Sequence, residues 1–534
     1  MTRYRLSEIK AETDVPMREL PAAIARKAGI RVSDISWWEV RRKSIDSRKK
    51  PHILFVYTAD FITEKPIRNS SKIRGLTVVD PDSEGVSSPA PGSEKLRGRP
   101  VVVGMGPAGL FAGLELARNG YRPIVIERGP AMDKRVEAVE RFRSDRVLDP
   151  EANMLFGEGG AGTFSDGKLG TGIKDGLIRQ VLAEFRDAGA GEEIMYLSKP
   201  HIGTDVLRTV IVNMRKKIES LGGEVVFGAK LESLQISDGA LERIVVRTGK
   251  FGGWLETNAL VLAIGHSARD TFAMIDQAGL EMQQKPFSIG VRMEHPQSVI
   301  DVSQYGEENT DKLAGDAVSA EKLPGKLPPA DYKINYKASN GRGVYSFCMC
   351  PGGEVVVCST KDGELCVNGM SNRKRDSGTA NSGILCDVRT EDFGSDDVLA
   401  GVRFQEKYER LAFENGGGDF TPPSCSMEDF LEKRDPAEKV IRSLPDFAAE
   451  AIREAVPHFA RKIHGYDDPA AVITAVETRS SSPVRLLRDE NGESSIRGIY
   501  PAGEGAGYAG GITSAACDGI RAAWHIMEKF AKPL

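Results

Sequence analysis

The sequence has few cysteines, little net charge and no long apolar run. Only seven of its 534 residues are cysteine, and none of them lies among the first 347 residues. So few thiols, in an odd number, argue against a disulfide framework and for a reducing, cytosol-like compartment. The formal net charge of -4 at pH 7 gives no overall field that would mark a nucleic-acid binder. No apolar stretch approaches the roughly 18 residues that a membrane-spanning helix needs.

The N-terminal residues also lack the apolar segment of a secretory signal. Met1 to Arg5 lead into mixed polar sequence, so we expect no export, no membrane contact and a cytoplasmic location. A composition of 40% hydrophobic and 28% charged residues is typical of a soluble globular chain. The length suits two to four domains.

Glycine, by contrast, occurs in motif-like runs, and the first run is a Gly-x-Gly-x-x-Gly turn. The β-branched residues Val101–Val103 lead straight into this turn at 104–109. An amphipathic segment, 110–117, follows, and a second apolar run, 124–126, ends in Glu127. The acid lies 23 positions after the first glycine, close to the spacing of about 20 in a dinucleotide-binding fingerprint.

The three glycines of this turn have separable physical roles. Gly104 permits the tight turn, Gly106 lets the backbone approach a pyrophosphate, and Gly109 lets helix and strand pack closely. The helix N-terminus offers unpaired N–H groups to the phosphates, and Glu127 would accept hydrogen bonds from an adenosine ribose. The alternative is a glycine turn kept for packing alone.

Two further glycine-rich runs occur later in the chain. The run 156–169 is too rich in glycine for the interior of a regular helix or strand. It suits either backbone that approaches a flat ligand or a flexible surface loop, and the embedded Phe164 and Leu169 favour the ligand. The run 498–512 precedes a helix that we predict over 514–530.

The N-terminal part has its own pattern. Residues 18–28 have helical spacing, and 37–40 and 52–57 are typical of strands, so we predict a polar connection over 41–50 between them. Residues 1–50 hold 13 lysines and arginines against seven acidic residues. The basic connection is interpreted as a solvated hairpin face, and contact with RNA or another polyanion is the alternative.

Four separated pieces resemble a two-dinucleotide-binding-domain flavoprotein of the glutathione-reductase type. Residues 104–109 with 127–129 resemble the N-terminal FAD fingerprint of that fold, and Leu231 falls where its backbone contacts adenine. Residues 263–265 resemble the end of its central strand, and 498–504 resemble its C-terminal flavin motif. That motif usually ends in Asp, whereas this chain has a Glu, whose carboxylate reaches one methylene further.

A narrower resemblance covers nearly the whole chain. Residues 157–169, 342–353 and 367–371 resemble a family of uncharacterised bacterial FAD-dependent dehydrogenases. This resemblance implies FAD as the cofactor and supplies no substrate.

The resemblance implies an α/β fold with an α+β insert. A small α/β domain (1–66) and a linker (67–97) precede a Rossmann-like FAD-binding domain in two parts, 98–274 and 466–534. Between these parts lies a substrate or cap domain, 275–465, in which we expect strands and loops to dominate.

We expect the FAD site to draw on all of these runs. FAD itself would carry the hydride or electrons, while the protein positions and tunes it. A helix that starts near 510–512 would direct N–H groups at the flavin ring and stabilise its anionic reduced form. The predicted cofactor-binding residues are Gly104, Gly106, Pro107, Ala108, Gly109, Glu127, Arg128, Arg135, Gly160, Gly162, Thr163, Lys168, Leu231, Gly265, Gly503, Glu504, Gly510, Gly511 and Ile512.

Other polar and thiol side chains leave several interpretations open. Cys348 and Cys350 are either a redox pair near the flavin, or a metal site with Cys358 or Cys366, or simply buried thiols. Their spacing matches no common zinc pattern. A further set would bind an anionic substrate or the flavin edge, or have structural roles: Lys168, His266, Arg292, Tyr345, Arg479 and Tyr508. No residue is assigned as catalytic, and no metal is expected.

The expected function is that of an FAD-dependent oxidoreductase acting on a small-molecule substrate. No second Gly-x-Gly-x-x-Gly follows a strand, and no Cys-x4-Cys pair is present, so either NAD(P)H docks only transiently or the electron donor is another compound. The alternatives are an FAD-dependent RNA-modifying enzyme that uses the basic N-terminal domain, and a non-catalytic flavin-binding sensor. The sequence leaves the oligomeric state open.

Overall fold

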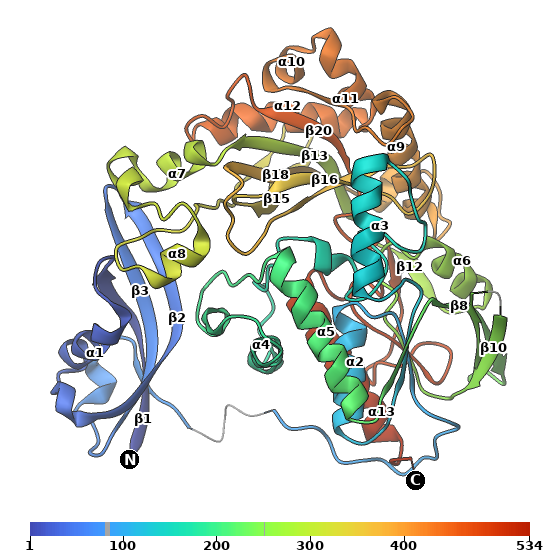
Figure 1. Cartoon of the computed structure of the whole chain (residues 1–534), viewed down its shortest axis with the longest axis horizontal. Coiled ribbons are helices and arrows are strands. Elements are labelled where there is room, and N and C mark those ends of the chain that lie inside the picture. Colours follow the sequence, from blue (N-terminus) through green and yellow to red (C-terminus); the bar gives the residue numbers. More distant parts are fainter. Residues whose placement is uncertain (81–85, 250, 534) are drawn as a thin grey trace.

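The protein is a mixed α/β molecule with three large sheets. The computed structural model describes residues 1–80, 86–249 and 251–533. Figure 1 shows an N-terminal sheet at the left, a parallel sheet with its helices at the lower right, and an antiparallel sheet that spans the top. Residues 81–85 of the predicted linker lie outside the described residues, while residues 92 and 94 bond to the backbone of the C-terminal helix at Met527 and Lys529.

The parallel sheet carries the first glycine turn. Its strands run in the order β22-β11-β5-β6-β7 and are parallel throughout. These short apolar runs are covered on both faces, which is why they show no polar alternation. The strands are β5 (Val101–Val103), β6 (Ile124–Glu127), β7 (Glu224–Phe227), β11 (Leu260–Leu262) and β22 (Ile499–Pro501).

Different layers cover the two faces of this sheet. One apolar cluster joins the sheet to four helices, and another joins it to a three-stranded antiparallel sheet and a helix. The four helices are α2 (Pro107–Arg118), α4 (Leu177–Asp187), α5 (Thr204–Ser220) and α13 (Ile512–Lys529). The other layer holds β8 (Ala229–Ser237), β9 (Ala240–Thr248), β10 (Phe251–Glu256) and α6 (Arg269–Gln277), and α3 (Met132–Asp145) follows β6 in the chain.

The antiparallel sheet has six strands in the order β14-β15-β18-β13-β20-β19. It includes residues up to 477, past the boundary at 465 that the sequence suggests. Its strands are β13 (Phe287–Pro296), β14 (Asn335–Lys337), β15 (Gly343–Cys350), β18 (Thr379–Val388), β19 (Ser424–Ser426) and β20 (Val472–Glu477). Two small pairs accompany it, β12 (Met282–Gln284) with β21 (Val484–Leu486), and β16 (Glu354–Cys358) with β17 (Cys366–Met370).

Strands and loops make up most of residues 275–465, as expected, but nothing in the sequence analysis indicated the helices in this part. This part also contains α7 (Gln297–Tyr305), α8 (Ala317–Lys322), α9 (Ala400–Gly416), α10 (Met427–Glu432), α11 (Glu438–Arg442) and α12 (Asp446–Ala460). The longer helices α9 and α12 place apolar residues at helical spacing, and these residues pack into the core beneath the sheet.

The predicted connection over 41–50 is wrong. The N-terminal sheet has the order β2-β3-β1-β4 with helix α1 (Leu20–Ala28), and β2 runs without interruption from Ile35 to Lys49. Its polar residues continue the ladder with β3 (His52–Thr63) as far as the pair Lys49–His52. Polar residues suit this strand because both of its faces are partly exposed. The other strands are β1 (Thr2–Glu12) and β4 (Leu76–Val78), so this sheet extends past residue 66.

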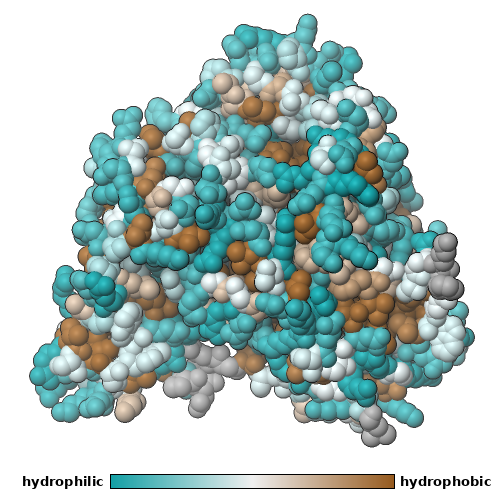
Figure 2. Space-filling view, viewed as in Figure 1, coloured by the Kyte–Doolittle hydropathy of each residue, from teal (hydrophilic) through white to brown (hydrophobic). Residues whose placement is uncertain are grey.

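Hydrophilic side chains cover most of the face in Figure 2, and apolar groups appear between them in separate patches. Among the described residues, no helix is long and apolar enough to cross a membrane. The large apolar clusters are instead buried between the sheets and their helices.

Candidate functional site

A cavity of about 380 Å³ lies at the carboxyl ends of the parallel strands. The residues that line it include the ends of β5, β6 and β11, the starts of α2 and α13, parts of the loop 155–170, and two consecutive residues of β15, Phe347 and Cys348. Ligands of open α/β sheets bind at this edge, where loops rather than paired backbone meet the solvent. The position therefore makes the cavity the first candidate for a cofactor site.

The glycine turn has two kinds of glycine. A Cβ on Gly104, whose φ is +95°, would lie 2.3 Å from the carbonyl oxygen of Ala263, and a Cβ on Gly109 would lie 1.8 Å from that of Gly104. Packing within the protein therefore excludes a side chain at both positions. A Cβ on Gly106 would have only the Cα of Gly160 nearby, at 3.9 Å. Gly106 lines the cavity, so its lack of a side chain leaves room for a ligand.

Glu127 is held rigidly at the end of β6. Its carboxylate accepts hydrogen bonds from the backbone N–H groups of Met105 (2.9 Å), Gly129 (2.9 Å) and Gly157 (3.1 Å). These bonds tie the glycine turn to the loop 156–169 and leave the carboxylate at the cavity wall. Such a fixed acid at the end of the second strand is the group that binds a ribose in dinucleotide sites.

Arg128, next in the chain, lies along the same wall. Its guanidinium forms ion pairs with Glu151 at 2.6 Å and Asp270 at 2.9 Å. It also lies over the ring of Phe156, 4.2 Å from the centroid. Leu231, at the start of β8, lines the cavity as well, so the positions predicted for the adenosine part of the ligand are close together in the fold.

The loop 156–169 is a packed part of the site rather than a free surface loop. Phe164 and Leu169 are buried. Arg135 of α3 lies fully buried behind the loop, where it donates to the carbonyl oxygens of Asn153 (3.0 Å) and Glu158 (2.6 Å). Burial lowers the pKa of Arg135 to about 9, although Glu127 and Glu158 oppose this shift. Arg135 thus supports the loop and does not line the cavity.

The start of α13 closes another side of the cavity. Gly510 and Gly511 have open space where a Cβ would lie, and both line the cavity with Ile512. The hydroxyl of Thr513 donates to the carbonyl oxygen of Leu169 at 2.7 Å and so joins the helix to the loop. The first N–H groups of a helix have no partners within it, so this end favours an anionic group.

Glu504 lines the cavity near this helix. Burial raises the pKa of its carboxyl to about 7, although Lys285 opposes the shift. Gly503 does not line the cavity; its N–H donates to Asp518 at 2.7 Å, and a Cβ there would lie 2.6 Å from that of Ala108.

A group of charged and thiol side chains, which we call the charged wall, comprises Asp166, Lys168 and Cys348. The ammonium of Lys168 lies 3.7 Å from Asp166 and 3.9 Å from the sulfur of Cys348. Burial disfavours its charge, but Asp166 and the neighbouring thiols outweigh this effect and raise the pKa of Lys168. Behind the wall, Arg375 pairs with Asp166 at 2.6 Å.

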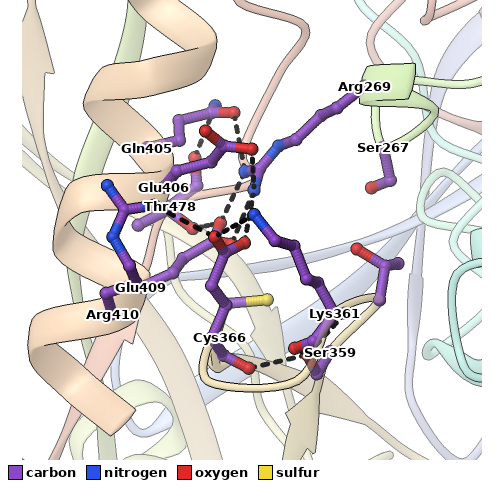
Figure 3. Close-up of polar contacts among 12 residues, drawn as sticks. Ser267, Arg269, Ser359, Lys361, Cys366, Gln405, Glu406, Glu409, Arg410 and Thr478 are labelled. Atoms are coloured by element: carbon purple, nitrogen blue, oxygen red, sulfur yellow. Dashed lines mark hydrogen bonds and ion pairs between the residues drawn. The ribbon is translucent and has the colours of Figure 1, made fainter. Parts of the chain in front are cut away.

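A second buried ion-pair cluster holds Arg479 against the cavity. Glu409 of α9 binds both Arg269 and Arg479 at 2.8 Å. Figure 3 shows the Arg269 side of this cluster, in which Gln405 and Glu409 project from α9 toward Arg269. Although burial acts the other way, the two arginines hold the pKa of Glu409 below its usual range. His266 lines the cavity nearby, and burial together with Arg479 and Arg269 lowers its pKa to about 4, so it is neutral at pH 7.

The cavity brings together most of the predicted cofactor-binding residues. Gly109, Arg135, Thr163 and Gly503 lie behind its walls instead. Of the other polar candidates, three line the cavity: Lys168, His266 and Arg479. The other three do not: Arg292 is buried behind Cys348, the hydroxyl of Tyr345 donates to that of Ser288, and the partly exposed ring of Tyr508 is covered by the guanidinium of Arg488. Two further lining residues, Phe156 and Asp166, lie within the run 156–169, whose glycine content was the signal for them. The others had no local signal: Lys230, Ser267, Phe347, Asn368 and Ser480.

The residues present fit FAD. A turn with an open glycine and a helix N-terminus suits its pyrophosphate, a fixed carboxylate suits its ribose, and a second helix N-terminus with two open glycines suits a ring that gains charge. Among the described residues, no cluster of acidic, histidine and cysteine side chains could hold a metal ion.

Comparison with known proteins agrees with this cofactor. Residues 286–480 match the family described as "FAD-dependent protein, C-terminal domain-like", and residues 4–62 match a domain of unknown function (DUF8436). The chain is 44% identical to an uncharacterised protein of Clostridium beijerinckii (strain ATCC 51743 / NCIMB 8052) over 99% of both chains. It belongs to the same family as that protein, and its cofactor is FAD.

Several solved flavoprotein structures are more distantly similar. CtdE in complex with FAD shares 13% identity over 79% of this chain and 82% of that chain, with a TM-score of 0.31. The flavin-dependent brominase Bmp2 shares 12% over 79% and 77%, with a TM-score of 0.36. A 3-ketosteroid-Δ4-(5α)-dehydrogenase from Rhodococcus jostii RHA1 shares 12% over 81% and 99%, with a TM-score of 0.35. Similarities this weak assign no reaction and no substrate to the chain.

Proposed function

We propose that this protein is an FAD-dependent oxidoreductase that transfers hydride or electrons between FAD and a small-molecule substrate. The observation that carries the proposal is the charged wall: Lys168 and Cys348 line the same cavity as the open glycine Gly106. Bound FAD supplies the two-electron chemistry. A protein that only stored the cofactor would have no need for a half-buried ammonium and a thiol beside it.

The side chains of the site would position and tune the cofactor. Lys168 keeps its charge because Asp166 offsets the cost of burial, so it would stabilise an anionic substrate or negative charge that develops on the flavin. Glu504, whose pKa burial raises to about 7, would hold or release a proton near neutral pH. Arg479, fixed by Glu409, would add a second positive charge to the wall.

The RNA-modifying alternative gains no support from the basic segment 41–50. Arg41 pairs with Glu39 and Asp60, each at 3.1 Å, and Arg48 pairs with Asp46 at 2.7 Å. The ammonium of Lys43 lies over the ring of Phe55, 4.1 Å from the centroid. Three of the basic side chains of this segment therefore interact with acidic or aromatic partners within the same domain.

Anaerobic reduction of the purified yellow protein tests the proposal. We expect NADH, NADPH or a member of a panel of small metabolites to bleach the flavin band, with a rate that depends on donor concentration. Lys168→Met should slow this reduction without loss of FAD, because the ammonium lies at the charged wall rather than at the glycine turn. If the protein retains FAD but no donor reduces it faster than it reduces free FAD, the sensor alternative replaces the oxidoreductase.

A further inference from the structure

Cys348 and Cys350 come together because the end of β15 is irregular. In a regular strand, residues two apart share a face but are separated by a full repeat of the pleat. Here the pairing of β15 with β18 shifts register between Phe347 and Cys350, and Cys348 has a φ of +44°. A bulge with a cysteine in the left-handed region is uncommon and marks a local constraint.

Both sulfur atoms approach one ammonium. The nitrogen of Lys168 lies 3.9 Å from the sulfur of Cys348 and 3.6 Å from that of Cys350. The thiol of Cys350 also donates to the carbonyl oxygen of Cys348 at 3.2 Å, so its side chain folds back over the preceding residues. Lys168 additionally donates to the carbonyl oxygen of Met349, between the two cysteines. The bulge and the lysine thus bring two free thiols to the same ammonium.

The charges around the pair favour a thiolate on one of the two cysteines. The interaction with the neighbouring Cys350 side chain is the largest cause that holds the pKa of Cys348 well below its usual range, and Lys168 and Arg292 add to it against the cost of burial. The same interaction and burial raise the pKa of Cys350. One thiolate beside one protonated thiol is the arrangement of a reactive dithiol.

Arg292 contributes to this arrangement without being free to move. It lies fully buried, donates to the carbonyl oxygen of Cys348 at 3.0 Å and pairs with Glu477 at 2.7 Å. The nearby acid Asp166 is likewise engaged, with Arg375. Glu477 and Asp166 are therefore both paired with arginines, and Lys168 and Arg292 are the charges that lower the pKa of Cys348.

The pair has access to the FAD cavity on one side only. Cys348 is half-buried and lines the cavity together with Gly510, Gly511 and Ile512, whereas Cys350 is fully buried behind it. A disulfide between them would face the cofactor site rather than open solvent.

We propose that Cys348 and Cys350 form a redox-active dithiol that exchanges two electrons with the FAD bound in this cavity. When the pair is oxidised, the S–H bond of Cys350 breaks and one S–S bond forms with the thiolate of Cys348; the two electrons and the one proton pass to FAD. The reverse transfer regenerates the thiolate, the thiol and oxidised FAD. This inference rests on the proposed function, because it assumes that FAD in this cavity is the redox partner.

A second cysteine pair provides a matched control. Cys358 and Cys366 are direct cross-strand partners in β16 and β17, and both are buried and free. Neither lines the cavity, and the sulfur of Cys358 contacts that of Met154 at 3.6 Å in an apolar cluster. Proximity alone therefore does not distinguish the two pairs, whereas the cavity and the two cations do.

Anaerobic titration of the FAD-loaded protein with dithionite tests the proposal. The wild-type protein and Cys366→Ser should each take up about four electrons per FAD, two for the flavin and two for the disulfide, after prior oxidation. Cys348→Ser and Cys350→Ser should each take up about two. Alkylation with iodoacetamide followed by peptide mass spectrometry should show a 348–350 disulfide in the oxidised protein and two carbamidomethyl groups after reduction.

The outcomes separate the two proposals. Uptake of about two electrons by the wild-type protein, with both cysteines alkylated before and after oxidation, would overturn the dithiol while leaving an FAD oxidoreductase intact. A disulfide that forms in the peptide map but is not reduced when the flavin is reduced would also overturn it. A protein that shows uptake of about four electrons but is reduced by no metabolite would contradict the proposed substrate chemistry and leave the dithiol standing.

Discussion

The glycine turn and the charged wall line the same cavity but are built in different ways. The turn, 104–109, is one continuous stretch between β5 and the start of α2, and the residues with which it lines the cavity are neighbours in the chain. The charged wall uses side chains from the loop after α3 and from β15, with Arg292 of β13 behind it. The glycine turn is therefore encoded by one local stretch of sequence, whereas the charged wall is assembled only when distant parts of the chain fold together.

The largest expected effect is on stability, and it comes from the glycine of the turn that packing within the protein requires. In Gly109→Ala the new Cβ would lie 1.8 Å from the carbonyl oxygen of Gly104, so helix and strand must move apart. We expect a loss of about 3 kcal/mol in the free energy of unfolding, measured by denaturant unfolding of the apoprotein. The control Gly252→Ala adds a Cβ with no atom within 4 Å; a Gly109→Ala protein as stable as this control would refute the packing role.

The next largest effect is on the affinity for FAD and not on the stability of the apoprotein. Gly106→Ala has only the Cα of Gly160 near its Cβ, at 3.9 Å, so the apoprotein should unfold like the wild type. The methyl group would occupy space needed by the pyrophosphate, and we expect FAD to bind about a hundredfold more weakly, about 2.7 kcal/mol. Flavin fluorescence during titration measures this, and full FAD retention after gel filtration would show that the turn is not the pyrophosphate site.

A smaller effect tests the charged wall. Lys168→Met removes a cation that lowers the pKa of the Cys348 thiol, so we expect alkylation of Cys348 by iodoacetamide at pH 7 to slow about fivefold. The affinity for FAD should change less than in Gly106→Ala. Alkylation of Cys366, followed in the same peptide digest, is the internal reference. An unchanged rate at Cys348 would mean that Lys168 does not stabilise the thiolate.

The smallest effect concerns Glu504 in the apoprotein. Its folded-state pKa is raised from 4.5 to about 7, so the stability that comes from the protonated form is present below pH 4.5 and is lost as the pH rises through about 7. Between pH 5 and pH 8, the wild type should therefore lose about 2 °C more in Tm than Glu504→Gln. Parallel Tm curves for the two proteins would contradict the raised pKa.

The difference between the glycine turn and the charged wall also explains which parts of the site the sequence could predict. The order strand, glycine turn, helix, strand and acid over 101–127 has local signals at every step, and it predicted the residues that line one side of the cavity. Arg292 and Cys348 are 56 positions apart in the chain, and nothing near either residue indicates that they meet. Whether Cys348 and Cys350 are a buried pair or reactive thiols depends on Lys168, which lies 180 positions away.

The two departures from expectation have different physical reasons. Residues 41–50 are polar enough to suggest a connection, yet residues up to Lys49 belong to a strand because β3 supplies backbone partners for them; tertiary contacts here override a local pattern. The helices α9 and α12 do carry apolar residues at helical spacing, but the apolar strand runs elsewhere in 275–465 are the stronger signal.

Isothermal titration of the apoprotein with FAD and, separately, with NAD⁺ tests the central claim most directly. The account predicts that one FAD binds per chain, that Gly106→Ala weakens this binding while Gly252→Ala does not, and that NAD⁺ gives no comparable heat. Binding of NAD⁺ in place of FAD, or FAD binding that is indifferent to Gly106, would contradict the assignment of this cavity.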